Sequence, residues 1–150
     1  MEDSIYFASV YRMIAVNFWE SAKKIDEKME KYEDGFPAGL TAIPFYFLIS
    51  HATELFLKAA LLKRGWTEQE LKKYDYRHNL DMLLEELQTI GISVTPKTVS
   101  IINGLHPQHL THALRYSVGI GQRISMPPPA LIYSALEELL LLTRISTQGK

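Results

Sequence analysis

Apolar side chains recur along this chain at steps of three and four residues, which is the period of an amphipathic helix. In residues 41–64 the steps from Leu48 through Ala52, Leu55 and Ala59 to Leu62 are 4, 3, 4 and 3. Ile49 and Phe56 widen this apolar face, so the helix should have little wet surface and lie at the centre of the fold. Residues 3–32 predict a first helix with one apolar stripe, made of Phe7, Val10, Ile14, Phe18, Ala22, Ile25, Met29 and Tyr32.

Capping residues divide the remaining chain into further helices. Thr67 and Glu70 have the spacing of a capping box, so a short helix should begin there. A main helix should follow over residues 79–90 and end at Gly91. Its apolar face would be formed by Leu80, Leu83, Leu84 and Leu87.

Two more helices are predicted in the second half of the chain. Thr95 before Pro96 is typical of an N-cap followed by proline at the first helical position. Asn103-Gly104 and Pro107 should bend or break this helix near its end. The last helix should run over about residues 129–146, with an inward face made of Ile132, Leu136, Leu139 and Thr143, widened by Leu140.

No stretch has the alternating period of a β-strand. The glycine and proline residues between the predicted helices form short connections, and none is a linker that would divide the chain. Connections of this length join antiparallel neighbours. The sequence therefore predicts a single all-α domain over residues 1–150, an up-down bundle of about five helices.

Composition narrows the chemistry. With 47% hydrophobic and 22% charged residues the chain is an ordinary globular protein, and without cysteine it has no disulfide, thiolate zinc site or cysteine nucleophile. The N-terminus lacks a secretory signal, and the longest apolar run, residues 42–49, is far shorter than the ~20 residues that span a bilayer. We therefore expect a cytoplasmic protein without membrane contact.

Charge is distributed unevenly. The net charge of −1 argues against strong non-specific binding of nucleic acid. Residues 96–126, however, contain no acid and carry Lys97, Arg115, Arg123 and three histidines. This segment is either a solvated face or the part of the chain best suited to meet a phosphate.

His51, Glu54 and Lys58 are spaced by three and four residues, so they share one side of the predicted central helix. Because charged residues in such a helix are seldom buried unless paired, Glu54 and Lys58 should pair with each other or with a neighbouring helix. The pair either fixes helix register or forms part of a ligand pocket. His78 precedes Asn79, a suitable N-cap, and would reach Glu54 if the two helices are adjacent.

These motifs resemble the HEPN family of helical domains. The run from His51 through Glu54 and Lys58 to Gly65, followed by His78-Asn79-Leu80, is similar to the family's Glu-Leu-x-Leu-Lys-Ala helix and its following His-Asp-Leu step, with Asn79 in place of the aspartate. Arg115-Tyr116 resembles the Arg-Tyr that often precedes the last helix. The resemblance implies a helical bundle, frequently a dimer, that acts as an RNA-cleaving toxin, an antitoxin or nucleotidyltransferase partner, or a nucleotide- or RNA-binding module.

The arginine–histidine signature of the RNase members is missing. No arginine of this chain is followed, after four to six residues, by a histidine. His112 and Arg115 supply a base and a cation in reversed order, which keeps open an RNA endonuclease with an atypical site. The alternatives are a non-catalytic module that binds a nucleotide, RNA or partner protein, and an antitoxin-type interaction subunit. The expected binding site comprises His51, Glu54, Lys58, His78, Arg115 and Tyr116, and a homodimer is expected.

Three histidines, His106, His109 and His112, follow one another at helical spacing. Two such histidines can share a metal, but a zinc site needs further ligands and this stretch contains no acid. We therefore expect no metal and no cofactor, and we expect these histidines on a surface turn, with an anion-binding patch as the alternative.

Overall fold

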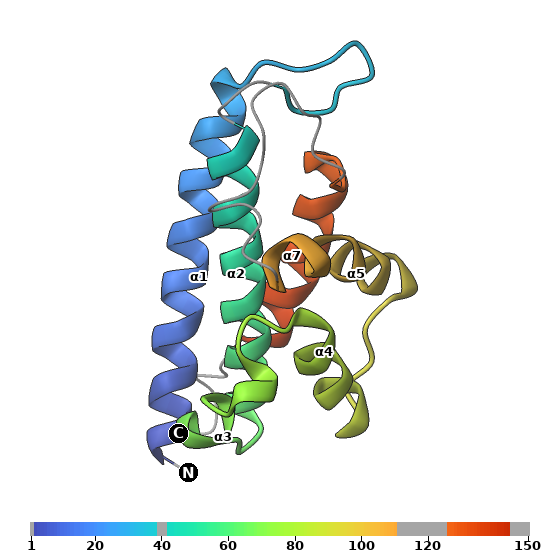
Figure 1. Cartoon of the computed structure of the whole chain (residues 1–150). Coiled ribbons are helices and arrows are strands. Elements are labelled where there is room, and N and C mark those ends of the chain that lie inside the picture. Colours follow the sequence, from blue (N-terminus) through green and yellow to red (C-terminus); the bar gives the residue numbers. More distant parts are fainter. Residues whose placement is uncertain (1, 39–41, 111–125, 145–150) are drawn as a thin grey trace.

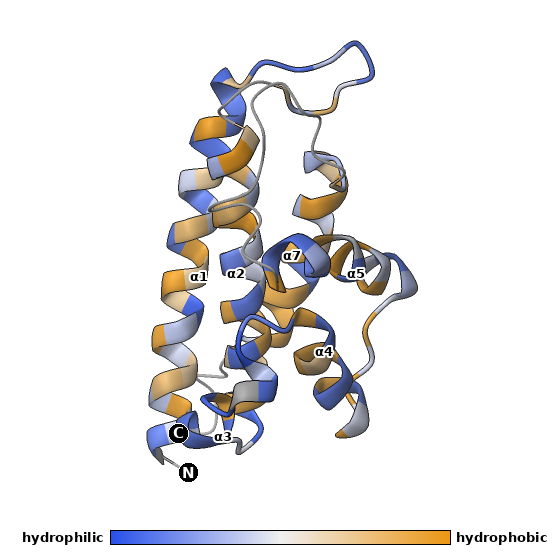
Figure 2. Ribbon diagram, in the orientation of Figure 1, coloured by the Kyte–Doolittle hydropathy of each residue, from blue (hydrophilic) through white to orange (hydrophobic). Residues whose placement is uncertain are grey.

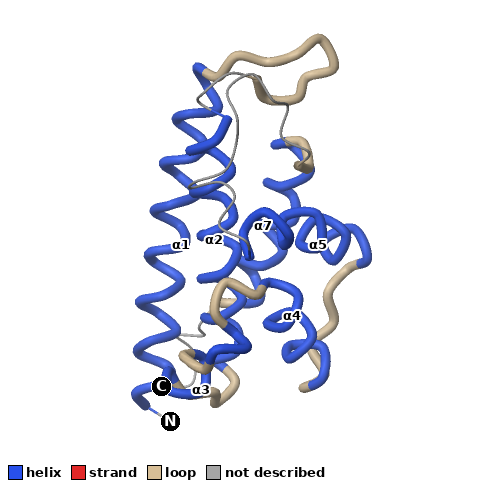
Figure 3. Tube along the Cα trace, viewed as in Figure 1, coloured by secondary structure: helices blue, strands red, loops and turns tan. Residues whose placement is uncertain are grey.

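The computed structural model describes residues 2–38, 42–110 and 126–144 (Figure 1). These residues form helices and loops without a β-strand, apart from one isolated bridge between Lys31 and Pro37 (Figure 3). The predicted all-α class is confirmed. The described elements are α1 (Glu2–Lys28), α2 (Ala42–Lys63), α3 (Glu68–Leu71), the 3-10 turn η1 (Tyr74–Tyr76), α4 (Leu80–Thr89), α5 (Pro96–Leu110) and α7 (Pro129–Leu142).

Helices α1 and α2 lie side by side and form the long pair of the fold (Figure 1). The fully buried positions of α1 are mostly small, which lets the two backbones approach closely. They are Ser4, Ala8, Ala15, Trp19 and Ala22. Larger members of the predicted stripe, such as Phe18, flank this line and are only partly buried.

The first helix ends earlier than expected. Tyr32 was expected on the helical stripe, but α1 stops at Lys28 and Tyr32 is 38% exposed. The chain turns back here, since the Tyr32 N–H donates to the Phe36 carbonyl at 2.8 Å and the Gly35 N–H donates to the Tyr32 carbonyl. Gly35 has φ +84°, the left-handed conformation that favours glycine, and it closes this turn after the helix has ended.

Helix α2 lies at the centre, as its apolar face predicted, and contacts α1, α4, α5 and α7. Among the described residues it alone is long and apolar enough to cross a membrane by length and composition. In the structure, 72% of that apolar stretch is buried by the other helices, as in the core helix of a soluble protein. Figure 2 shows hydrophilic residues interrupting its apolar surface near the middle.

The predicted caps are present. Thr67 and Glu70 form the capping box of α3, and Asn79 caps α4 by accepting from the Met82 N–H at 3.0 Å. On α7 the predicted face is confirmed, since Ile132, Leu136, Leu139 and Thr143 are all buried. The helix ends at Leu142 with Thr143 as C-cap, and residues 145–150 lie outside the described residues.

Helix α5 continues through Pro107, so the predicted break near its end is absent. Buried Leu105 and His109 anchor it on both sides of the proline, which offsets the hydrogen bond that proline cannot make. Gly104 does not end the helix. Its lack of a side chain makes room for Pro127, since a Cβ at this position would lie 2.9 Å from Cγ of Pro127. Figure 1 shows α5 beside the α1–α2 pair and roughly at right angles to it, so the bundle is not a simple up-down array.

A carboxylate on α7 caps α5 from outside. Glu138 Oε1 accepts hydrogen bonds from the hydroxyls of Thr95 and Thr98, each at 2.6 Å, and Oε2 accepts from the Thr95 N–H at 2.9 Å. Burial would raise the pKa of Glu138, but these hydrogen bonds outweigh it and lower that pKa below its ordinary value of 4.5. The negative charge also faces the positive end of the α5 dipole.

Glu138→Gln should therefore make stability less dependent on pH. A carboxylate with a lowered pKa contributes stability that is present above its ordinary pKa and is lost as pH falls through the folded value. Urea unfolding at about pH 7 should show the variant less stable than the wild type, and the gap should narrow towards about pH 3. Glu137→Gln, at the exposed neighbouring position, is the control. A gap that stays the same over this range would contradict the capping role.

Candidate functional site

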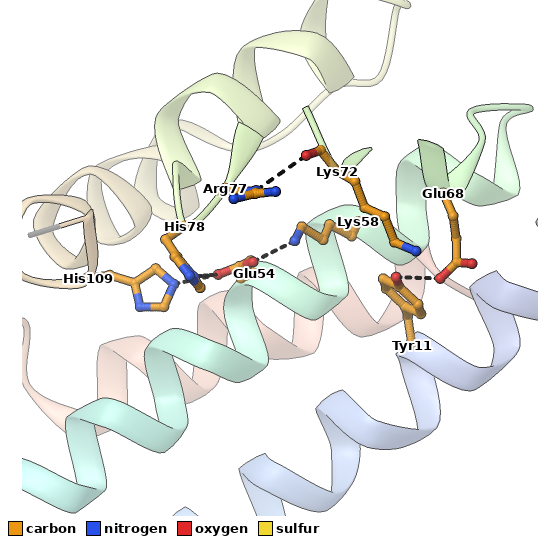
Figure 4. A network of polar contacts seen from close by, with 8 residues as sticks. All are labelled: Tyr11, Glu54, Lys58, Glu68, Lys72, Arg77, His78 and His109. Carbon is orange, nitrogen blue, oxygen red and sulfur yellow. Dashed lines mark hydrogen bonds and ion pairs between the residues drawn. The ribbon is translucent and has the colours of Figure 1, made fainter. Parts of the chain in front are cut away.

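A buried carboxylate, Glu54 of α2, is the centre of the most connected polar cluster among the described residues (Figure 4). Only 3% of Glu54 is exposed. Its Oε1 lies 2.6 Å from Nε2 of His109 and 3.0 Å from Nδ1 of His78. Its Oε2 accepts from the Lys58 ammonium at 2.6 Å. Both carboxylate oxygens are thus paired, as burial of a charge requires.

Three elements build this cluster. Glu54 and Lys58 stand one turn apart on α2, His109 lies in the last turn of α5, and His78 comes from the connection between η1 and α4. The rings of His78 and His109 meet edge to face with centroids 5.4 Å apart. The cluster therefore joins the central helix to two segments far away in sequence.

The backbone of His78 is strained. Its φ is +53°, and it is the one residue other than glycine with a positive φ in the described part of the chain. Such a conformation costs on the order of 1–3 kcal/mol and persists where the surrounding structure fixes it. Here Asn79 caps α4 immediately afterwards, while the His78 ring is directed at Glu54.

Glu54 remains ionised in the folded protein. Burial alone would raise its pKa, but the hydrogen bond from His109 and the charge and hydrogen bond of Lys58 outweigh burial and hold the pKa well below its usual range. The carboxylate is therefore an acceptor that orients its neighbours, and it carries no proton to donate at neutral pH.

His51 lies one turn before Glu54 on α2. Its ring stacks on Phe47 with centroids 5.9 Å apart and meets the edge of Phe18 at 5.1 Å. The centroid of the His109 ring is 6.2 Å away. His51, Glu54 and His109 each offer a ligand atom within 4.8 Å of the others, so these three residues are the candidate metal-ligating group.

Cations gather on one side of the cluster. The side chain of Lys58 is 15% exposed, in contrast to 4% for that of Glu54. Figure 4 shows Lys58, Lys72 and Arg77 on the same side of Glu54, with Nε of Arg77 donating to the Lys72 carbonyl at 3.3 Å. Lys72 and Arg77 are exposed, and within the described residues neither forms an ion pair with an acid.

A second polar contact lies next to these cations. The hydroxyl of Tyr11 donates to Oε1 of Glu68 at 2.7 Å. Burial, the hydrogen bond to Glu68 and the nearby carboxylates raise the pKa of Tyr11 to about 12. Tyr11 therefore stays protonated and ties α1 to α3 at the edge of the cluster (Figure 4).

The structure brings together four of the residues singled out from the sequence, His51, Glu54, Lys58 and His78. The other three, His112, Arg115 and Tyr116, lie outside the described residues, as does Arg123. The atypical endonuclease site built on His112 and Arg115 is therefore not described.

His109 is the residue that sequence analysis misplaced. It was expected on a surface turn, but it is only 5% exposed and contacts Glu54. Its spacing carried the signal, since it follows buried Leu105 by four residues and Ile102 by seven, on the inward face of α5. His106 points elsewhere, with Nε2 3.6 Å from Oδ2 of Asp81. The two histidines thus have different partners.

No protein-family model, no curated protein and no solved structure matches this chain.

Proposed function

We propose that this chain is a HEPN-like, non-catalytic binding module that receives a phosphate-bearing ligand, a nucleotide or a segment of RNA, beside the Glu54 cluster. The observation that carries the proposal is the group of three cations, Lys58, Lys72 and Arg77, on one side of a buried and already paired carboxylate. Lys72 and Arg77 form no ion pair with an acid among the described residues, and positive charge of this kind attracts anions.

The three cations have complementary roles in this proposal. Lys58 has three N–H donors and uses one for Glu54, so it retains donors for a phosphate oxygen. Arg77 and Lys72 reach further into solvent and add the long-range attraction. Glu54 and His109 support the site from the buried side, because Glu54 contacts both Lys58 and His78 and is itself held by His109.

We propose a non-catalytic module because the sequence motif of the RNase members is missing. Metal-free RNA cleavage needs a base for the 2′-hydroxyl and a cation for the phosphate, and the arginine–histidine pair that supplies both in the RNase members is missing. A homodimer belongs to the same proposal. Large apolar side chains on the outer face of α1, Tyr6 and Met13, are 65% and 57% exposed and favour association of two copies.

Lys72→Ala with Arg77→Ala should weaken RNA binding about tenfold and reduce its salt dependence, because each lost phosphate contact lowers the slope by about one. The measurement is fluorescence anisotropy of a labelled single-stranded RNA, and separately of a labelled nucleotide, over a range of salt in the presence of chelator. Both positions are exposed, so stability should change by less than about 0.5 kcal/mol.

Lys24→Ala with Lys28→Ala is the matched control, since it removes the same charge from exposed positions of α1. Equal binding by the two double variants would overturn the assigned surface. Cleavage of the RNA by the wild type in chelator would overturn the non-catalytic function and favour the endonuclease.

A further inference from the structure

We propose that His51, Glu54 and His109 form a binding site for a divalent transition metal ion of the zinc class. The three side chains each place a ligand atom within 4.8 Å of the other two, deep in the helical bundle. This inference stands independently of phosphate binding, because it uses none of the three cations as a ligand.

The donor set defines the class of metal. Two imidazoles and one carboxylate form the protein ligands of several zinc enzymes, with the fourth position left for water, and also of the facial triad that holds iron(II). Magnesium and calcium prefer oxygen ligands and are poorly matched by two imidazoles. The site should therefore prefer Zn²⁺ or Co²⁺ to Mg²⁺ or Ca²⁺.

The ligands stand on rigid elements. His51 and Glu54 are three residues apart on α2 and project from the same side of it. His109 comes from α5, which packs against α2. Phe47 and Phe18 fix the His51 ring, so the three groups are positioned by packing and lose little freedom on binding a metal.

The present distances correspond to the site without a metal. Nε2 of His109 is 2.6 Å from Oε1 of Glu54, which is a hydrogen-bond distance. Two ligands of one tetrahedral zinc, each with a bond of about 2.0–2.1 Å, lie about 3.3 Å apart. A metal would take the place of this hydrogen bond, with neutral His109 carrying its ring proton on Nδ1, and the two atoms would separate by about 0.7 Å.

Neighbouring groups orient the carboxylate and also oppose the cation. Lys58 on Oε2 and His78 on Oε1 hold Glu54 in one orientation, as outer partners of metal ligands commonly do. The ammonium of Lys58 repels a cation, but it binds the far oxygen and is partly exposed, where solvent screens its charge. We therefore expect measurable affinity below that of structural zinc sites.

The expectation of no metal came from the absence of acids around the histidines in residues 96–126. Those residues form one segment only, and a metal site can draw ligands from several. The fold supplies the missing carboxylate from α2 and the second imidazole from the same helix. The proposed ligand set therefore combines residues that lie up to 58 positions apart, from His51 to His109.

Titration of the untagged, chelator-treated full chain with Co²⁺ tests the site. We expect visible d–d absorption that saturates at one Co²⁺ per chain and is displaced by Zn²⁺. His51→Gln and His109→Gln should each weaken Co²⁺ binding by at least about tenfold, since each removes one ligand. His106→Gln is the matched control, because His106 stands three residues from His109 on α5 but contacts Asp81.

No saturable absorption in the wild type, or unchanged binding by His51→Gln, would overturn the proposal. His51 is only partly buried, so this variant should remain folded by circular dichroism even if His109→Gln does not. Lys72→Ala with Arg77→Ala should bind Co²⁺ like the wild type. Failure of the metal site and failure of phosphate binding are thus seen in different variants.

Discussion

Glu54→Ala should lower the free energy of unfolding by about 3–5 kcal/mol, the range expected when one member of a buried ion pair is removed. The substitution leaves the Lys58 ammonium without its acceptor and the buried Nε2 of His109 without a hydrogen-bond partner at Glu54. Urea unfolding at neutral pH, followed by circular dichroism, measures the loss. Glu85→Ala, at an exposed position of α4, should change stability by less than about 0.5 kcal/mol.

A double variant separates charge from packing in the same cluster. Glu54→Leu with Lys58→Met removes both charges and keeps apolar volume, and such replacements of a whole pair are often neutral. His109 still loses its acceptor, which costs about 1–3 kcal/mol. The double variant should therefore lie between the wild type and Glu54→Ala. A double variant less stable than Glu54→Ala would show that the unpaired Lys58 charge is not the cause of the stability lost in Glu54→Ala.

A large loss in Glu54→Ala would not by itself decide between a structural and a functional cluster. The paired carboxylate stabilises the junction of α2, α5 and the His78 segment, and it holds the groups that the two proposals use. The variants that test function were therefore chosen at positions outside the pair. Lys72 and Arg77 are exposed, and His51 is only partly buried.

Helix limits were predictable where a local rule sets them. Thr67, Asn79 and Thr95 are N-cap residues whose side chains accept backbone hydrogen bonds within a few positions, so sequence alone locates the starts of α3, α4 and α5. The central place of α2 followed from its apolar faces. These features depend on neighbours in the chain, and the structure confirms them.

Features set by distant contacts were not predictable. Pro107 was expected to disturb α5, but burial on both of its sides keeps the helix continuous. The inward position of His109 could have been read from its spacing after Leu105, but its partner, Glu54, lies 55 residues away and could not. The spacing of His51, Glu54 and Lys58 predicted the part of the cluster that lies on α2. Only the fold could reveal the part contributed by α5.

Trp19→Ala should lower the free energy of unfolding by about 3–5 kcal/mol, as expected for a large aromatic side chain removed from a core. Trp19 is 4% exposed and is the one large side chain among the fully buried positions of α1, where the others are alanine or serine. Its ring meets those of Phe56 on α2 and Tyr133 on α7, with centroids 6.2 and 6.3 Å apart. Trp19 therefore joins α1 to two other helices.

The loss should come mainly from packing, since the indole N–H of Trp19 makes no hydrogen bond within the described structure. The Lys23 ammonium, 4.2 Å from the centroid of the Trp19 ring, adds a smaller cation–π contribution. Urea unfolding followed by circular dichroism is the suitable measurement, and Lys24→Ala at an exposed position of α1 is the control. Trp19→Phe should recover part of the loss, because it refills part of the cavity. If Trp19→Ala were no less stable than Lys24→Ala, the close pairing of α1 with α2 would not depend on this side chain. The small buried residues of α1 would then have to supply the contact by themselves.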